Sequence, residues 1–269
     1  MNKNNILDEI VDKKYGTFID GKFFDSRIKI KKNHIEENKG SIITYLKEFF
    51  KKNYKIYNFI VYVFSQSYFD LKLNKYRDDI IKSSNVTLNI GSGNGKISEN
   101  IINLDIINYD NVDIISDASK ISILDNKIDF IVNELNLEHV YNYKDVILES
   151  YRILKNGGKV WYLIPFIEGF HASPYDYNRF TIKSIEKNFY DAGFKDIKIG
   201  IYSGPASGFL WILTEFIAIL FSFNLKILYE INLIILMLLL WPIKFLDIFL
   251  NKFRNSENIA GVFYLIAKK

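Results

Sequence analysis

Three glycines at alternate positions follow a short β-rich run, and a lone carboxylate ends the next apolar run. The glycines are Gly91, Gly93 and Gly95, and the carboxylate is Asp105. Glycine lets a backbone turn sharply and come close to a ligand, because no Cβ stands in the way. A carboxylate at the tip of the neighbouring strand can accept both hydroxyl groups of a ribose. Together these residues indicate a site for a nucleoside-containing cofactor.

The short segment between the glycines and Asp105 narrows the choice of cofactor. A dinucleotide site requires a third glycine that begins a helix whose N-terminus meets the pyrophosphate. Here the pattern is Gly-x-Gly-x-Gly, and the residues before Asp105 leave space for a loop or a single helical turn. The sequence therefore favours a cofactor without a diphosphate over the alternative of a nicotinamide-dependent enzyme.

A second group of reactive side chains comprises His171, Asp176, Tyr177 and Arg179. We expect these residues on a loop beyond a strand, and such loops often carry substrate-binding groups. A histidine near an aspartate can act as a general base on a hydroxyl group. In the structural alternative, Asp176 and Arg179 pair to hold the loop and Tyr177 only packs.

Composition limits the other kinds of site. The sequence has no cysteine and three histidines far apart in the chain, so neither a disulfide nor a metal cluster is expected. For His139 a structural role on its loop is at least as well supported as catalysis, and His34 has no evident partner. The net charge of +4 is small and the lysines are scattered, which argues against nucleic-acid binding. A cysteine-free chain also fits a reducing compartment such as the cytoplasm.

Strands and helices must alternate to position these residues. Such alternation predicts an α/β, Rossmann-like, mostly parallel sheet whose ligand crevice lies beyond the carboxyl ends of the strands. Thr181 is a candidate N-cap for a helix that ends at Gly193. The expected strands are 86–90, 101–105, 112–116, 128–133, 159–164, 197–201 and an antiparallel last strand, 260–267, and the expected helices are 143–155, ended by Asn156-Gly157-Gly158, and 182–191.

The expected domain organisation has two parts. Residues 1–82 form an N-terminal extension with a turn at Asp20-Gly21 and an aromatic-rich helical cap over 41–82. Residues 83–269 form the main domain, and an apolar helical insert, 209–253, precedes the last strand.

The apolar insert is the exceptional region of the chain. Gly208–Leu225 and Ile227–Ile243 are almost free of charge, yet each contains a glutamate and neither reaches the ~18 uncharged residues of a confident membrane span. Because the preceding strand runs toward the ligand edge, the insert should emerge beside the site. Two apolar helices there favour docking on a bilayer, and the alternatives are a buried lid or a homodimer interface. The cations expected near lipid headgroups are Lys226, Lys244, Lys252 and Arg254.

With these motifs in place, the chain resembles the class I S-adenosylmethionine-dependent methyltransferases, especially the small-molecule type found among bacterial surface-polysaccharide genes. The resemblance covers about 86–213 and resumes at 259. Its marks are Leu88-Asn89-Ile90-Gly91-Ser92-Gly93, Asn103-Leu104-Asp105, Ser116-Asp117-Ala118, Leu137-Glu138-His139-Val140, Tyr151 to Gly158, Pro165-Phe166, His171 to Thr181, and Gly204-Pro205-Ala206-Ser207.

The resemblance implies roles for individual residues. Gly91 and Gly93 would approach the methionine part of the cofactor, and Asp105 would hold the ribose. Asp117 would meet the adenine, although an aspartate is equally common as the first residue of a turn. The implied cofactor-binding set is completed by Ser92, Gly95, Ile106, Ala118 and, facing the sulfonium, Asn133.

These expectations together predict a cytoplasmic enzyme at the inner face of the membrane. It would transfer a methyl group from S-adenosylmethionine to an oxygen of a glycan or lipid-linked sugar in surface-polysaccharide synthesis. The alternative is a non-catalytic, membrane-associated scaffold or partner protein with the same fold.

Overall fold

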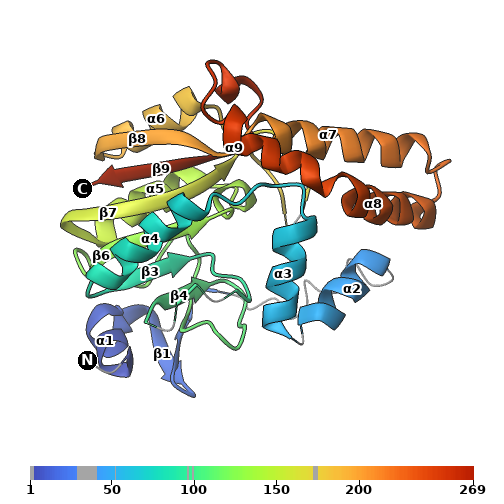
Figure 1. The fold of residues 1–269 in the computed structure, drawn as a ribbon. Helices are drawn as coiled ribbons and strands as arrows, with labels where there is room; N and C mark the ends of the chain where they lie inside the picture. The colour runs from blue at the N-terminus through green and yellow to red at the C-terminus, as the bar shows by residue number, and fades with distance from the viewer. Residues whose placement is uncertain (1–2, 29–40, 52, 96, 99, 172–174) are drawn as a thin grey trace.

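A computed structural model of the protein describes residues 3–28, 41–51, 53–95, 97–98, 100–171 and 175–269 (Figure 1). Its centre is a nine-stranded sheet with the order β1-β2-β5-β4-β3-β6-β7-β9-β8. The strands are β1 (Gly16–Ile19), β2 (Lys22–Asp25), β3 (Thr87–Ile90), β4 (Ile102–Asp105), β5 (Ile114–Ile115), β6 (Ile128–Glu134), β7 (Leu154–Pro165), β8 (Lys195–Ser203) and β9 (Val262–Lys268).

The sheet is parallel from β2 to β7, and β9 runs antiparallel to both of its neighbours. All four residues of β3 are buried, as expected for a central strand that is covered on both faces. The expected Rossmann-like sheet with an antiparallel last strand is therefore confirmed. In the strand order, β3 has β4 on one side and β6 on the other, so the order reverses at β3.

Helices cover both faces of the sheet (Figure 1). One buried apolar cluster joins the sheet to α1 (Lys3–Ile10), α5 (Tyr143–Ile153) and α6 (Ile182–Asp191). A second cluster on the other face joins it to α4 (Leu71–Ser83). Single turns of 3-10 helix occur at η1 (Lys13–Tyr15), η3 (Leu137–His139) and η5 (Ser256–Ile259).

The end of α5 differs from the sequence expectation. The helix ends at Ile153, and Asn156-Gly157-Gly158 belong to β7 rather than to a helix stop. The register between β6 and β7 shifts between Ile128 and Phe130, so this glycine pair lies in a bulge. Gly157 has φ +81°, a conformation that favours glycine, so the irregularity is local to the backbone. The α6 prediction is confirmed, because the Thr181 side chain accepts a hydrogen bond from Ser184 N.

The N-terminal turn is confirmed, with φ of 50° at Asp20 and 78° at Gly21. The hairpin is more than an appendage, because β2 pairs in parallel with β5 and extends the main sheet. The proposed division of the chain at residue 83 stays a prediction. The helical segment after the hairpin consists of α2 (Ile42–Lys51), α3 (Tyr54–Phe64) and α4.

The apolar insert forms two helices, α7 (Pro205–Leu220) and α8 (Lys226–Leu240), which project from the sheet side by side (Figure 1). They are followed by η4 (Trp241–Leu246) and α9 (Asp247–Leu250). The carboxylate of Asp247 anchors the hairpin, because it accepts hydrogen bonds from Gly204 N, Ala206 N and Ser207 N at the start of α7.

One cation of the insert does not lie where the sequence placed it. Lys244 is 1% exposed, and its Nζ donates to the carbonyl oxygens of Tyr62 and Ser65 at the end of α3. The expectation of a headgroup contact at Lys244 is wrong, because α3 supplies acceptors that only the tertiary structure brings near. Lys226, Lys252 and Arg254 are exposed.

Candidate functional site

A cavity of about 440 Å³ lies at the carboxyl ends of β3, β4 and β6, where the strand order reverses. Such a point is where open α/β sheets bind ligands, and the volume suits a small molecule. The lining residues come from the loops that follow five strands: Gly91, Gly93, Leu104, Asp105, Ile106, Ile107, Tyr109, Ser116, Asp117, Ala118, Leu135, Asn136, His139, Val140, Tyr141, Tyr175 and Tyr177.

The glycine loop forms one wall of this cavity, with φ of +70° at Gly91 and +54° at Gly93. A Cβ on Gly91 would lie 2.2 Å from Cγ of Asn136, so the loops after β3 and β6 meet through a position that only glycine fits. No atom in the described part of the chain lies within 4 Å of a Cβ on Gly93. No helix occurs among the described residues of 91–101, as the short spacing predicts.

Asp105 lies at the tip of β4 with its carboxylate against the glycine loop. Oδ2 accepts a hydrogen bond from Gly93 N at 2.8 Å, and Oδ1 accepts one from Ile107 N at 2.8 Å. Burial raises the pKa of Asp105, and these backbone donors counteract that rise in part. The carboxylate is thus held rigidly at the cavity wall, in the position expected for a ribose-binding group.

Two asparagines that hold this region were missed by the sequence reasoning. Asn111 donates from Nδ2 to Gly93 O at 3.1 Å and to Gly95 O at 2.7 Å, which ties the glycine loop to the loop after β4. The Asn136 side chain occupies the space that a Cβ on Gly91 would need, and its Nδ2 is buried without a hydrogen-bond partner among the described residues. The position of Asn136, three residues after the expected strand 128–133, was the available signal for it.

The remaining residues of the expected cofactor set divide into two groups. Ile106, Asp117 and Ala118 line the cavity. Asp117 also begins a turn, because its Oδ1 accepts hydrogen bonds from both N and Oγ of Ser119 at 2.8 Å. Its position is therefore compatible with both expected roles, the start of a turn and a contact with the adenine. Ser92, Gly95 and Asn133 lie outside the cavity lining.

Asn133 is the residue that the sequence analysis placed facing the sulfonium. It is 0% exposed, and neither its Oδ1 nor its Nδ2 has a hydrogen-bond partner among the described residues. Its neighbour in the register is Tyr162 on β7. The assignment of Asn133 to the sulfonium stays a prediction.

Asp176 and Arg179 brace the loop that follows β7. The guanidinium donates to both carboxylate oxygens of Asp176, from Nη1 at 2.5 Å and from Nη2 at 2.8 Å, and it also donates from Nη2 to Gly169 O. Asp176 accepts a further hydrogen bond from His171 N at 2.8 Å. Burial alone would raise the pKa of Asp176, but these donors lower it below its usual value. These contacts match the structural alternative, and direct catalytic roles for the pair stay predictions.

The mouth of the cavity is aromatic. The Tyr177 ring lies 5.6 Å from the rings of Tyr141 and Tyr175, and all three residues line the cavity. The first pair meets edge to face and the second is tilted, and tyrosine rings offer apolar faces with polar tips to an acceptor. Residues 172–174 of the same sequence motif lie outside the described residues.

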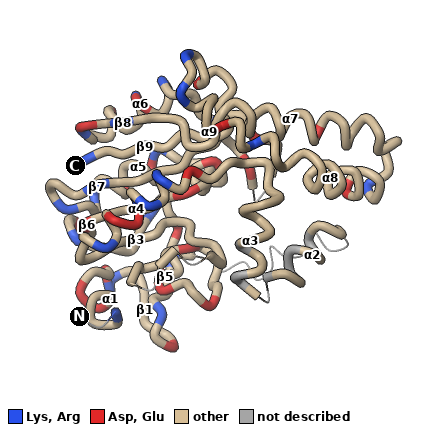
Figure 2. The backbone as a smooth tube through the Cα atoms, in the orientation of Figure 1, with Lys and Arg blue, Asp and Glu red and all other residues tan. Residues whose placement is uncertain are grey.

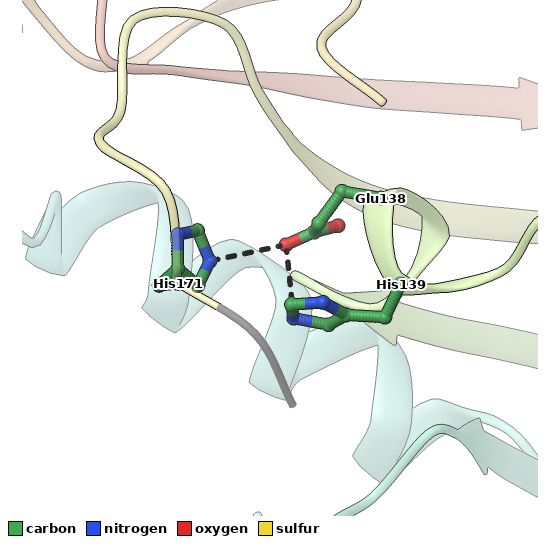
Figure 3. Close-up of side chains that lie close together, drawn as sticks. All are labelled: Glu138, His139 and His171. Atoms are coloured by element: carbon green, nitrogen blue, oxygen red, sulfur yellow. Dashed lines mark ion pairs between the residues drawn. The ribbon is translucent and has the colours of Figure 1, made fainter. Parts of the chain in front are cut away.

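Two histidines and a glutamate meet beside the cavity (Figure 3). Oε1 of Glu138 lies 3.7 Å from Nε2 of His139 and 3.8 Å from Nε2 of His171. His139 lines the cavity, whereas Glu138 is fully buried beneath it. Burial together with the nearby charge of Glu138 raises the pKa of Glu168, a second carboxyl group near His171, to about 7.

This cluster weakens the reasoning by which no metal was expected. That expectation relied on histidines scattered in the sequence, and the fold brings two of the three together with Glu138. The expectation itself stays a prediction, and Glu138 is a residue that sequence reasoning missed. The signal for it was its place in Leu137-Glu138-His139, immediately after the strand that ends at the cavity.

The apolar hairpin adjoins this loop. Ser203 at the end of β8 and Pro165 at the end of β7 both pair with Val262, so α7 begins at the same edge of the sheet as the His171 loop. The ring of Trp211 on α7 stacks on that of His171 at 6.0 Å. The expectation that the insert emerges beside the site is confirmed.

Comparison with solved structures finds weak likenesses. An S-adenosylmethionine-dependent methyltransferase from Archaeoglobus fulgidus is 18% identical with a TM-score of 0.47, over 73% of this chain and 93% of that one. Phosphoethanolamine N-methyltransferase 2 of Haemonchus contortus, in complex with S-adenosyl-L-methionine, is 17% identical with a TM-score of 0.47. That match covers 74% of this chain and 52% of the other, so this chain spans about half of that protein.

No curated protein matches the chain. A protein-family model described as "Hypothetical methyltransferase" matches residues 18–198, which is more than half of the chain and includes every lining residue of the cavity. The chain therefore belongs to this methyltransferase family.

Proposed function

We propose that the protein is an S-adenosylmethionine-dependent methyltransferase that methylates a hydroxyl oxygen of a glycan or lipid-linked sugar at the membrane surface. The observation that carries the cofactor assignment is Asp105, which lies at the strand-order reversal against the Gly91–Gly93 loop. A ribose hydroxyl group would donate to this carboxylate in place of one of its backbone donors. The methionine part would lie along the glycines and the adenine beside Asp117 and Ala118.

Methyl transfer makes few demands on the protein. S-adenosylmethionine supplies an activated methyl group, so the chain has to align the acceptor oxygen and accept its proton. The imidazole of His139 lines the cavity, and that of His171 lies next to it, with the ring centroids 5.3 Å apart. The three tyrosines at the mouth would hold a sugar ring by its apolar face. Oxygen is favoured as the acceptor atom because a neutral hydroxyl must lose a proton to such a base.

Calorimetry with S-adenosylhomocysteine and with NAD tests the cofactor assignment. We expect saturable binding of the first compound and none of the second. Asp105→Ala should weaken binding at least tenfold, since two hydrogen bonds to a charged group are lost. Asp110→Ala, an exposed aspartate five residues further on, is the matched control and should bind as the unaltered protein does. Binding of neither compound would favour the non-catalytic scaffold.

The membrane part of the proposal is supported by the outer surface of α7 and α8. The segment Lys226–Leu250 is long and apolar enough to cross a bilayer, and only 17% of its most apolar window is buried. Charged residues are sparse along α7 and α8 and frequent around the sheet (Figure 2). The glutamates of the hairpin are used within the protein, since Glu215 accepts from Tyr229 Oη and Glu230 accepts from Ile42 N.

Many large apolar side chains of this hairpin are exposed. At more than 50% exposure they include Phe209, Ile212, Phe216, Ile219, Leu220, Phe221, Phe223, Leu225, Ile227 and Leu239. A surface of this kind beside the catalytic mouth suits a bilayer that holds the acceptor. Lys226, Lys252 and Arg254 would lie near the headgroups.

Sedimentation with phosphatidylglycerol–phosphatidylcholine vesicles tests this surface. We expect the unaltered protein to sediment with the vesicles and the double variant Phe216→Glu/Leu239→Glu to lose at least tenfold in partitioning. Tyr190→Glu changes a 73% exposed side chain on α6 and is the control. Equal partitioning of the two variants would contradict the proposal. A homodimer in vesicle-free buffer that the double variant dissociates would identify the surface as a dimer interface instead.

A further inference from the structure

We propose that Glu138, His139 and His171 form a binding site for one divalent transition-metal ion, for which Zn²⁺ is the best match. One ligand atom from each residue lies within 4.8 Å of the others. In Figure 3 the Glu138 carboxylate points between the two imidazole rings, which approach it from η3 and from the loop after β7. Their ring centroids are 5.3 Å apart at an interplanar angle of 90°.

The backbone fixes which nitrogen of each histidine carries a proton. Nδ1 of His139 lies 2.6 Å from Tyr175 O, and Nδ1 of His171 lies 2.9 Å from Gly169 O. A carbonyl oxygen can only accept, so each Nδ1 carries the hydrogen. At His171 this assignment follows the shorter contact, because the guanidinium Nη2 of Arg179, which can only donate, lies 3.4 Å from the same Nδ1. In the neutral rings each Nε2 therefore carries a lone pair, and both Nε2 atoms lie near Oε1 of Glu138.

Glu138 brings a third set of lone pairs to the same point. It is 0% exposed, and neither of its oxygens accepts a hydrogen bond from any residue in the described part of the chain. A buried carboxylate without donors is costly unless a cation neutralises it. The two Nε2 atoms and the Glu138 carboxylate are three acceptors close together, and a cation bound between them would compensate the buried charge.

The distances suit an ion better than a proton. The separations of 3.7 and 3.8 Å between Oε1 and the two Nε2 atoms are too long for N–H···O hydrogen bonds. Ligands bound at about 2.0–2.2 Å around a tetrahedral zinc lie roughly 3–4 Å from one another. Oε1 of Glu138 is thus already at that separation from both nitrogen atoms, and all three ligand atoms lie within 4.8 Å of one another.

The surroundings of the histidines also match a metal site. Ligating imidazoles usually donate their other N–H to a carbonyl or carboxylate, which holds the ring in place. Tyr175 O and Gly169 O have this role here. Trp211 packs on His171, and the Asp176–Arg179 pair holds the loop that carries it.

Two imidazoles and one carboxylate are a ligand set of catalytic zinc, which leaves a fourth position open. His139 lines the cavity, so the open position would face the acceptor. This role rests on the proposed function: the acceptor hydroxyl would bind the ion, which lowers the hydroxyl pKa so that its proton leaves to water. The oxygen would then take the methyl group from the sulfonium, and S-adenosylhomocysteine would be released. His171 then holds the ion, and the ion replaces the imidazole as the activating group.

Calorimetric titration of the chelator-treated, full-length protein with Zn²⁺ at pH 7.5 tests the site. We expect one equivalent to bind, and Glu138→Gln or His171→Asn to weaken binding at least tenfold. His34→Asn is the matched control, since it removes the remaining histidine of the sequence and should leave binding unchanged. Co²⁺ in the unaltered protein should give the visible absorption of a four-coordinate site, a readout that needs no variant.

Two further measurements separate the outcomes. S-adenosylhomocysteine titration of the same variants reports on the cofactor cavity, so a folded protein that binds this compound but no Zn²⁺ would overturn the metal site alone. The metal site would also be overturned if the unaltered protein showed no saturable Zn²⁺ binding, or if His34→Asn lost as much Zn²⁺ affinity as His171→Asn. Nitrogen NMR that finds Nε2 of either ring protonated and insensitive to Zn²⁺ would identify an imidazolium–carboxylate pair instead.

Discussion

Replacement of Gly91 by alanine should destabilise the protein far more than the same replacement at Gly93. Both positions have positive φ, of +70° and +54°, so each alanine incurs the cost of a left-handed conformation, about 1–2 kcal/mol. Only at Gly91 would the new Cβ collide, at 2.2 Å from Cγ and 2.7 Å from Cβ of Asn136. Overpacking of this kind adds about 1–3 kcal/mol. We therefore expect a loss of about 2–5 kcal/mol for Gly91→Ala and about 1–2 kcal/mol for Gly93→Ala.

A double-variant cycle isolates the collision. Asn136→Gly removes all three atoms that a Cβ on Gly91 would approach most closely, so the penalty in Gly91→Ala/Asn136→Gly should fall toward that of Gly93→Ala. Urea unfolding at constant protein concentration gives the four free energies, provided that the m-value is unchanged. Gly91→Ala as stable as Gly93→Ala, or a double variant no more stable than the sum of its parts predicts, would refute the reasoning.

Two further predictions concern buried carboxylates. Burial alone would raise the pKa of Asp25, but hydrogen bonds from Arg27 and Ser122 lower it, so its stabilising contribution is present above the unfolded pKa of about 3.8 and is lost as the pH falls through the lower folded value. Asp25→Asn should cost about 2–3 kcal/mol at pH 7 and flatten the acid limb of the urea-midpoint profile, and an unchanged limb would contradict this assignment. Asp247→Ala leaves the backbone donors of Gly204, Ala206 and Ser207 without their acceptor. We expect a loss of about 3 kcal/mol and faster hydrogen exchange at the start of α7 with β3 unaffected, whereas uniform acceleration would indicate global unfolding.

Local patterns accounted for most of the sheet. Short apolar runs such as 130–132 mark strands that are buried on both faces, and helix ends such as Thr181 carry their own hydrogen-bonding side chains. The end of α5 was placed too late, because a glycine pair that looks like a helix stop is also what a strand bulge requires.

The wall of the cavity formed by the glycine loop was largely predictable for a related reason. Gly91, Gly93 and Asp105 lie at strand ends, and the carboxyl ends of parallel strands meet at one edge of the sheet. Lys244 shows where this reasoning ends. A lysine in an apolar run reads as a headgroup contact, yet carbonyl oxygens more than 170 residues away in the sequence bind it.

The sequence by itself determined the α/β class, the glycine loop with Asp105 and the apolar hairpin, because each depends on residues near one another in the chain. Only the tertiary structure decided that Glu138, His139 and His171 meet, since they come from two loops that follow different strands. The histidine tautomers depend on contacts with Tyr175 O and Gly169 O, and the Glu138 carboxylate has no hydrogen-bond donor among the described residues. Both are properties of packing rather than of composition. The physical reason is that the Glu138 carboxylate is buried, and the two imidazoles approach it, only when segments distant in the sequence pack together and exclude water.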